Sequence, residues 1–395
     1  TLLLAFVAAS IFARAAYLEN VPTTLLQPNG DTLFCLQTGD EFYHRLHDDL
    51  GFTIVQDPET GYYVYAQLDA DGRLVPSSVV AHSFPQARRL QALGIQPGLM
   101  PPAHELRARA KGFDVPARLR KPQAKSGNTN RGTLNNLVIF IRFADEANMG
   151  CTFNQVEPMF NDSSANSTSQ YAYFRQASYG HLSIVSHFYP QPQGTTVLSY
   201  QDSMPRAYFS PYNATTNPIG YTDRYDGRER AMIQRCINWL NANNIIPSSL
   251  NLDFDNDGYI DNIVFVVSGT YTGWSDILWP HKWSLYDRYC YINGKRVYTF
   301  NLQLAGSGSH YFSSSTLCHE MFHTLGAPDL YRYYDNSGVS TSGSWDLMEQ
   351  NSTPPQHMSA WMKLQYGNWL DSIPEITAPG TYTLSSLADQ SASPS

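Results

Sequence analysis

The chain has 395 residues, of which 15% are charged and 13% aromatic, and its formal net charge at pH 7 is −8. At roughly 100–200 residues per domain, this length suggests two or three domains. The acidic balance and the lack of long Lys or Arg runs argue against a nucleic-acid partner, because such proteins carry a basic surface. No run of about 20 apolar residues occurs, which argues against a permanent membrane span.

The first residues predict export. Residues 1–12 read TLLLAFVAASIF, which has the length of a signal-peptide h-region, and Ala13-Arg14-Ala15 follows as an A-x-A cleavage pattern. An initiator Met and a basic n-region are missing, so we expect residues 1–15 to be a signal peptide clipped at its N-terminus. The alternative is a buried strand or helix that opens the first domain. We expect a secreted, extracellular protein.

Residues 16–100 predict a small β-rich domain. Turn signals at 57–61 and 69–72 flank a strand at 62–66. From 101 to 133 the composition changes to Lys and Arg among Pro, Gly, Ser and Asn. Such a segment buries little apolar surface, which predicts an exposed linker that is open to activating proteolysis.

A second domain is predicted over residues 134–377. Continuous apolar runs predict buried strands at 137–141 and 263–267, alternation predicts a strand at 182–189, and helical spacing predicts helices at 170–177 and 226–244. The fold class is therefore α/β (α+β). Residues 378–395 contain a strand-like segment at 380–387, and we expect them to begin a truncated C-terminal region.

The stretch HEMFHTLGAPD predicts a catalytic zinc site. His319 and His323 lie one turn apart on one helix face, so both imidazoles can reach one ion at about 2.0–2.1 Å. Glu320 is offset around the helix, where a general base can address a metal-bound water. Gly326 can adopt the left-handed conformation that ends a helix, after which the chain turns back and Asp329 can supply a third ligand.

The identity of the third zinc ligand has an alternative. Glu349 is a more distant carboxylate, placed as in proteases whose third ligand follows much later in the chain. The turn at Gly326 favours Asp329. Three protein ligands and one open position are typical of a catalytic zinc site rather than a structural one.

These motifs resemble the immune inhibitor A-like family of secreted bacterial metallopeptidases. The likeness is carried by HEMFHTLGAPDLY (319–331), SGSWDLM (342–348), HMSAWMKLQYGNW (357–369), YFRQASYGHLSI (173–184), DFDNDGYIDNIVFV (253–266), ILWPHKW (277–283) and the propeptide-like stretch 39–66. It spans about residues 20–385. The resemblance implies a metzincin-like catalytic domain with a mixed sheet and an active-site helix, zinc chemistry, secretion and proteolytic activation.

Two details belong to this resemblance. Met348 lies where the Met-turn of the metzincins forms an apolar floor below the zinc ligands. One departure is the stretch QYGNW at 365–369, where the family more often has Leu-Gly-Trp.

A second metal site is predicted in residues 253–261. Asp253, Asp255, Asp257 and Asp261 alternate around a Gly, with the main-chain oxygen of Tyr259 in the seventh position of a calcium loop. The bidentate Glu of an EF-hand is missing, so we expect a structural, non-EF calcium site. The alternative is an acidic surface turn, but four neighbouring carboxylates repel one another unless a cation joins them.

If the N-terminal domain is a propeptide, one of its residues is expected to block the open zinc position. The candidates are Cys35, Asp40, Glu41, His44 and His47. A thiolate binds zinc well, but a buried apolar role for Cys35 in a strand at 32–36 is favoured.

The sequence thus predicts a secreted zinc-dependent endopeptidase, made as a zymogen, in which Glu320 is the general base on a zinc-bound water. We expect protein or peptide substrates, a monomer, Zn²⁺ as catalytic and Ca²⁺ as structural cofactor, and the chain's own propeptide as inhibitor. The alternatives are a catalytically idle secreted zinc-binding or adhesion protein that retains the protease fold, and a zinc hydrolase of a non-peptide bond.

Overall fold

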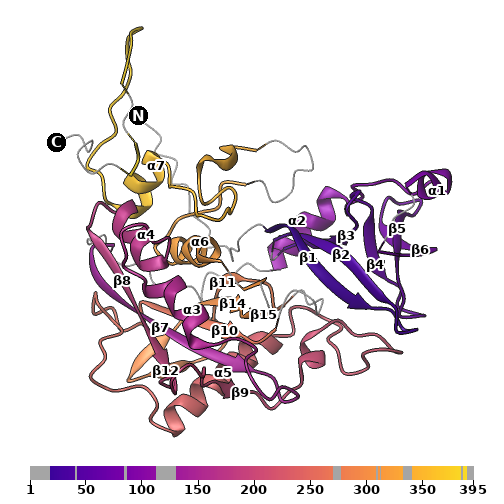
Figure 1. The fold of residues 1–395 in the computed structure, drawn as a ribbon, viewed down its shortest axis with the longest axis horizontal. Helices are drawn as coiled ribbons and strands as arrows, with labels where there is room; N and C mark the ends of the chain where they lie inside the picture. Colours follow the sequence, from indigo (N-terminus) through magenta and orange to yellow (C-terminus); the bar gives the residue numbers. More distant parts are fainter. Residues whose placement is uncertain are drawn as a thin grey trace, which may run out of the picture.

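The structure is a computed structural model, and it describes residues 18–40, 42–83, 87–112, 130–269, 277–307, 310–311, 313–331, 340–383 and 386–388. The fold is mixed α/β with several sheets, as the sequence predicts (Figure 1). An N-terminal antiparallel sheet lies beside a larger part that combines a mixed sheet with helices. The predicted signal peptide, residues 1–15, lies outside the described residues.

The N-terminal part is a six-stranded antiparallel sheet followed by two helices. In chain order these are β1 (Leu18–Leu26), β2 (Thr32–Gly39), β3 (His44–His47), β4 (Thr53–Gln56), β5 (Tyr63–Leu68), β6 (Leu74–Val80), α1 (Ala87–Ala92) and α2 (Ala103–Gly112). The strands pair in chain order, so short turns suffice to join them. Leu33, Leu46 and Ile54 of the sheet pack with Leu90 of α1 into a separate core.

Cys35 belongs to this N-terminal core. It lies in β2 and is 6% exposed, which confirms its interpretation as a buried apolar residue. Burial raises the pKa of the Cys35 thiol to about 12. The thiolate that a zinc-blocking cysteine needs is therefore disfavoured at neutral pH.

The segment predicted as a linker, 101–133, differs from that prediction at both of its ends. Helix α2 occupies its first part and buries Leu106. At its last part, Asn130 Nδ2 donates to Tyr366 O at 2.7 Å, and Trp369 Nε1 donates to Asn130 O at 2.7 Å. Asn130 is thus bound to the larger part through both its side chain and its main chain. Residues 113–129 lie outside the described residues.

The larger part is built on a mixed sheet with the strand order β11-β14-β10-β7-β8. Its strands are β7 (Gly132–Arg142), β8 (Leu182–Tyr189), β10 (Asn262–Val267), β11 (His281–Ser284) and β14 (Thr299–Leu304), with the short β9 (Tyr200–Gln201) paired to β7. β8, β7, β10 and β14 are parallel, whereas β11 runs antiparallel to β14 at the edge. Parallel neighbours need long crossovers, and helices fill these.

Helices cover both faces of this sheet. They are α3 (Phe153–Asn161), α4 (Gln170–Ala177), α5 (Arg228–Ala242), α6 (Ser314–Thr324) and α7 (Ala360–Met362). Ile139 and Ile141 of β7 pack with α5, whereas Val138 and Phe140 pack in a cluster with residues of α3 and α6. Because side chains alternate along a strand, α5 lies on one face and α3 and α6 lie on the other (Figure 1).

The helices and strands predicted within 134–377 are confirmed as α4, α5, β7, β8 and β10. The remaining short elements are β12 (Cys290–Ile292), β13 (Lys295–Val297), β15 (Gly306–Ser307), β16 (His310–Tyr311), the 3₁₀ turns Arg206–Phe209 and Gly343–Trp345, and the π-turn Lys363–Gly367. The strand-like segment predicted at 380–387 forms no strand over 380–383, where all four residues are exposed. Within the described ranges, no helix is both long and apolar enough to span a membrane.

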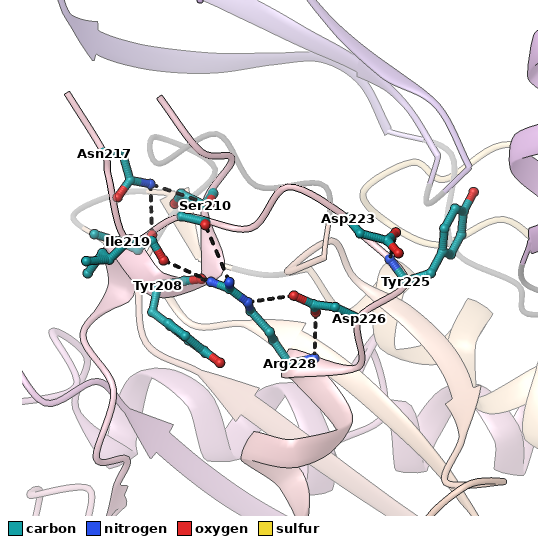
Figure 2. A network of polar contacts seen from close by, with 10 residues as sticks. Tyr208, Ser210, Asn217, Ile219, Asp223, Tyr225, Asp226 and Arg228 are labelled. Carbon is teal, nitrogen blue, oxygen red and sulfur yellow. Dashed lines mark hydrogen bonds and ion pairs between the residues drawn. The ribbon is translucent and has the colours of Figure 1, made fainter. Parts of the chain in front are cut away.

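A long connection, residues 206–227, leads into α5 and is held by Arg228. Its guanidinium donates to Tyr208 O at 2.5 Å and to Ile219 O at 3.0 Å, and it pairs with Asp226 at 2.7 Å (Figure 2). It also lies 3.9 Å from the ring centroid of Tyr208. The rigid fork of one arginine thereby fixes three separate points of this connection.

Candidate metal centre

Helix α6 begins and ends where the sequence provides caps. Ser313 Oγ accepts a hydrogen bond from Thr316 N at 3.2 Å, as an N-cap does. Gly326 has a φ of 105°, and the N–H of Ala327 bonds back to Phe322 O at 3.0 Å. The predicted left-handed glycine turn is therefore present, and it reverses the chain toward the helix.

The structure brings His319, His323 and Asp329 together. The two Nε2 atoms lie 3.0 Å apart, and Asp329 Oδ1 lies 2.9 Å from that of His319 and 3.2 Å from that of His323. Each Nδ1 faces a carbonyl that can only accept, Leu347 O at 2.9 Å and Ala327 O at 2.8 Å. Each Nδ1 therefore carries a proton, and in the neutral form of each ring Nε2 presents a lone pair.

This arrangement fits a metal ion. Two nitrogen lone pairs cannot hydrogen bond to each other, yet the two Nε2 atoms point into one space with a carboxylate oxygen. A tetrahedral ion with bonds of about 2.0–2.1 Å separates its ligand atoms by about 3.3 Å, close to the spacing found. The set of two imidazoles and one carboxylate is one that zinc accepts.

The charges of the site also favour a cation. Burial raises the pKa of Asp329, but His323 and His319 outweigh it and hold this pKa well below its usual range. Burial lowers the pKa of His319, and the hydrogen bond and charge of Asp329 overcome this and raise it to about 9. Asp329 is therefore ionised in a buried place, which costs free energy unless positive charge is held there.

Glu320 lies beside this group and outside it. One residue along a helix corresponds to about 100° of rotation, so its side chain leaves α6 in another direction than that of His319. It is 0% exposed. Burial lowers the pKa of His281 on β11, and the charges of Glu229 and Glu320 reverse this and raise it. The Glu320 carboxylate thus lies near both the metal-ligand group and the edge strand.

Glu349, the alternative third ligand, is engaged elsewhere. Ser340 Oγ donates to Glu349 Oε1 at 2.6 Å, and Thr341 N donates to the same oxygen at 3.0 Å. The Glu349 carboxylate is thus hydrogen-bonded to residues 340 and 341. It is Asp329 that joins the two histidines.

Met348 lies in a buried turn next to the metal centre. It packs with Phe322 of α6, and its main-chain oxygen accepts from Leu330 N at 2.8 Å. Asp346 holds the turn, because its two carboxylate oxygens accept from Met348 N at 2.9 Å and from Ser359 N at 2.7 Å. Sequence reasoning missed Asp346. Its signal is an Asp two residues before the Met, where it can accept from the main chain.

Asp40 of the N-terminal part lies within electrostatic range of Asp329, a residue of the candidate metal centre. Burial is the main cause that raises the pKa of Asp40 to about 7, and the nearby charge of Asp329 raises it further. Phe42 is 3% exposed and packs in the core cluster of the larger part, which contains α5. Arg224 of the connection in Figure 2 donates to Phe42 O at 3.1 Å.

The other candidates for a blocking residue have different surroundings. His44 stacks on Trp279 with ring centroids 4.1 Å apart. His47 is held within the N-terminal sheet, with Nδ1 at 2.7 Å from Asp48 O and Nε2 at 2.8 Å from Thr38 Oγ1. Glu41 lies outside the described residues.

The predicted calcium loop brings three of its carboxylates together. Oxygens of Asp253, Asp255 and Asp261 lie within 4.8 Å of one another. Asp257 is not in that group, and its Oδ1 accepts from Tyr259 N at 2.9 Å.

A lysine also reaches this acidic loop. Lys295 Nζ lies 2.6 Å from Asp253 Oδ2, a partner that sequence reasoning missed because it comes from β13. Burial would raise the pKa of Asp253, but Lys295 and two main-chain hydrogen bonds lower it. Burial, together with the neighbouring aspartates, raises the pKa of Asp261 to about 7.

No protein-family model matches the chain, and no curated protein matches its sequence. A function for this chain is therefore inferred from the chemistry of the candidate metal centre.

Proposed function

We propose that the chain is a zinc-dependent endopeptidase that hydrolyses peptide bonds of proteins. The observation that carries this proposal is the convergence of His319, His323 and Asp329 in one buried group, with the Glu320 carboxylate next to it. Three ligands leave a coordination position open, and a catalytic zinc site needs that position.

The residues divide the chemistry among them. Zinc, when bound by His319, His323 and Asp329, supplies a Lewis acid that polarises a carbonyl and lowers the pKa of water. The Glu320 carboxylate accepts the proton of the attacking water and then delivers it to the nitrogen of the leaving amine. The carbonyls of Leu347 and Ala327 hold both imidazoles with Nε2 unprotonated, which a ligand requires.

The architecture supports a metzincin-like catalytic domain as the finer form of this proposal. The sheet has an antiparallel edge strand, β11, that contacts α6, and a buried methionine turn lies beside the ligands. An antiparallel edge strand next to a metal centre offers unpaired main-chain groups to an extended peptide.

We further propose that the enzyme is secreted and made as a zymogen. The secretion proposal rests on the reading of residues 1–15. The zymogen proposal is supported by Phe42 and His44, which pack against the larger part, and by Asp40, whose pKa is raised by burial and further by the charge of Asp329. Cleavage within 113–129 would free the N-terminal part to leave.

We propose calcium as a structural cofactor of the loop 253–261. The proposal is supported by the approach of three carboxylates and by the pKa of Asp261, which burial and, after it, the charges of the neighbouring aspartates raise. Lys295 neutralises part of this charge at Asp253.

The function is tested with Glu320→Ala. We expect the processed variant to bind one zinc and to lose casein hydrolysis by about 100-fold to 10,000-fold or more, because proton transfer is lost. Glu375→Ala is the matched control, since Glu375 is an exposed glutamate of the same part of the chain. Substantial activity of Glu320→Ala would exclude Glu320 as the base. A processed wild type that binds zinc but cleaves no protein would favour the idle zinc-binding alternative.

A further inference from the structure

A row of buried amide side chains crosses the mixed sheet beneath α6. Asn136 of β7, Asn262 of β10 and Asn301 of β14 are each at most 1% exposed. Asn262 Nδ2 donates to Asn136 Oδ1 at 2.7 Å, and Asn301 Nδ2 donates to Asn262 Oδ1 at 3.2 Å. Asn136 Nδ2 extends the row to Ser186 Oγ of β8 at 2.9 Å. The row therefore links adjacent parallel strands.

This row is joined to the metal-binding helix. Thr324 Oγ1, in the last residue of α6, donates to Asn262 Oδ1 at 3.0 Å. Gln170 of α4 closes a second link, because its Nε2 donates to Leu317 O of α6 at 3.3 Å and its Oε1 accepts from Asn136 Nδ2 at 3.3 Å. Thr324 follows His323 directly and comes one turn after Glu320.

The polar row is unusual for its surroundings. Apolar residues pack around it between the sheet and α6, among them Val264, Val266 and Leu317. An apolar contact tolerates small rotations and shifts of a helix, whereas a hydrogen bond fixes direction and distance. Burying an amide costs free energy, and its hydrogen bonds largely offset that cost. The row therefore contributes little net stability. Its effect is to define one position of the helix.

We propose that Asn262, acting through Thr324, is a positioning residue of the metal centre. It fixes the rotation and depth of the last turn of α6, and with them the approach of His323 Nε2 and Glu320 to Asp329. Asn262 lies in the stretch 253–266, whose acidic part is proposed to bind calcium, and Asn262 has no role in that proposal. The inference rests on the proposed zinc site.

The test uses Thr324→Val, which keeps the shape of the side chain and removes the donor. We expect zinc affinity of the full chain, measured by chelator competition, to fall about 10-fold or more. The visible spectrum of the Co²⁺-substituted protein should change, because the ligands lose their fixed geometry. Thr324→Ser, which restores the hydroxyl, should return both to the wild-type values.

Val266→Ala controls for general destabilisation. Val266 packs beneath the same helix without polar contact, so its truncation should lower the midpoint of urea unfolding and leave the Co²⁺ spectrum unchanged. Wild-type zinc affinity and spectrum in Thr324→Val would overturn the proposal, as would an equal loss in Val266→Ala or no rescue by Thr324→Ser. A wild type that binds no zinc would overturn the proposed function as well.

Discussion

The two imidazoles of the metal centre are oriented by main-chain carbonyls. His319 Nδ1 donates to Leu347 O, and His323 Nδ1 donates to Ala327 O. The Ala327 carbonyl comes from the turn that ends α6 and is therefore local. The Leu347 carbonyl comes from a distant turn, which depends on the buried carboxylate of Asp346. An outer hydrogen bond of this kind sets ring orientation as firmly as the ligand's own backbone does.

Asp346→Ala is expected to weaken the zinc site without removing a ligand. The variant loses the carboxylate that accepts hydrogen bonds from two main-chain N–H groups, which should lower the free energy of unfolding by about 1–3 kcal/mol. Zinc affinity should fall about 10-fold to 100-fold, because the Leu347 carbonyl no longer holds His319. Urea unfolding and chelator competition measure the two effects. Asp371→Ala, at an exposed aspartate, should change neither. Unchanged zinc affinity in Asp346→Ala would show that the turn does not orient His319.

Among the elements, those that local sequence determines could be predicted. Helix α6, its reversal at Gly326 and the approach of Asp329 follow from spacing and from one glycine, and all three are present. The bounds of α4 and β8 also agree, because apolar periodicity decides them.

Features that depend on distant segments could not be predicted in the same way. Asn262 contacts Thr324 across 62 positions of the chain, and Lys295 contacts Asp253 across 42. Neither pair has a local pattern, since the strand order that brings them together is set by packing of the whole sheet. The helix α2 was missed because its many charged residues resemble a linker in composition, although Leu106 is buried.

The acidic loop 253–261 gives a prediction at the scale of one element. The raised folded-state pKa of Asp261 means that, between about pH 3.9 and about 7, the folded chain binds more protons than the unfolded chain. Without a divalent cation, the free energy of unfolding should therefore fall as pH rises through this window. Calcium favours the ionised form and should restore stability at pH 7.5, by about 2.7 kcal/mol at 100 times its Kd.

Urea unfolding at pH 5 and at pH 7.5, with calcium or with a chelator, measures both effects. Asp261→Asn should reduce the fall with pH, to which Asp40 also contributes because its pKa is raised to about 7, and it should weaken the response to calcium. Asp69→Asn is the matched control, because Asp69 also accepts main-chain N–H groups in a turn but stands outside the acidic group. A stability at pH 7.5 that calcium leaves unchanged would contradict the proposed calcium site.

At the scale of the whole molecule, the described residues of the N-terminal part contact the larger part at the turn after β4 and at Phe42 and His44. The turn after β4 meets the connection 206–227 through long hydrogen bonds, such as that from Asn213 Nδ2 to Asp57 O at 3.4 Å. Phe42 and His44 are instead buried, with Phe42 in the core cluster of the larger part and the His44 ring on Trp279. The contact through Phe42 and His44 buries apolar surface, so it stabilises the association of the two parts more than the hydrogen-bonded turn does.

Phe42→Ala should make the uncut chain partly active. Losing a buried phenylalanine costs about 3–5 kcal/mol, and here that loss falls on the contact that holds the neighbourhood of Asp40 against the larger part. We expect the uncut variant to cleave a short fluorogenic peptide about 10-fold faster or more than the uncut wild type. After removal of the N-terminal part, the two should cleave it equally fast. Phe34→Ala, at a phenylalanine 61% exposed in the same sheet, should stay latent. Equal basal rates for Phe42→Ala and wild type would contradict this role, and full activity of the uncut wild type would exclude a zymogen.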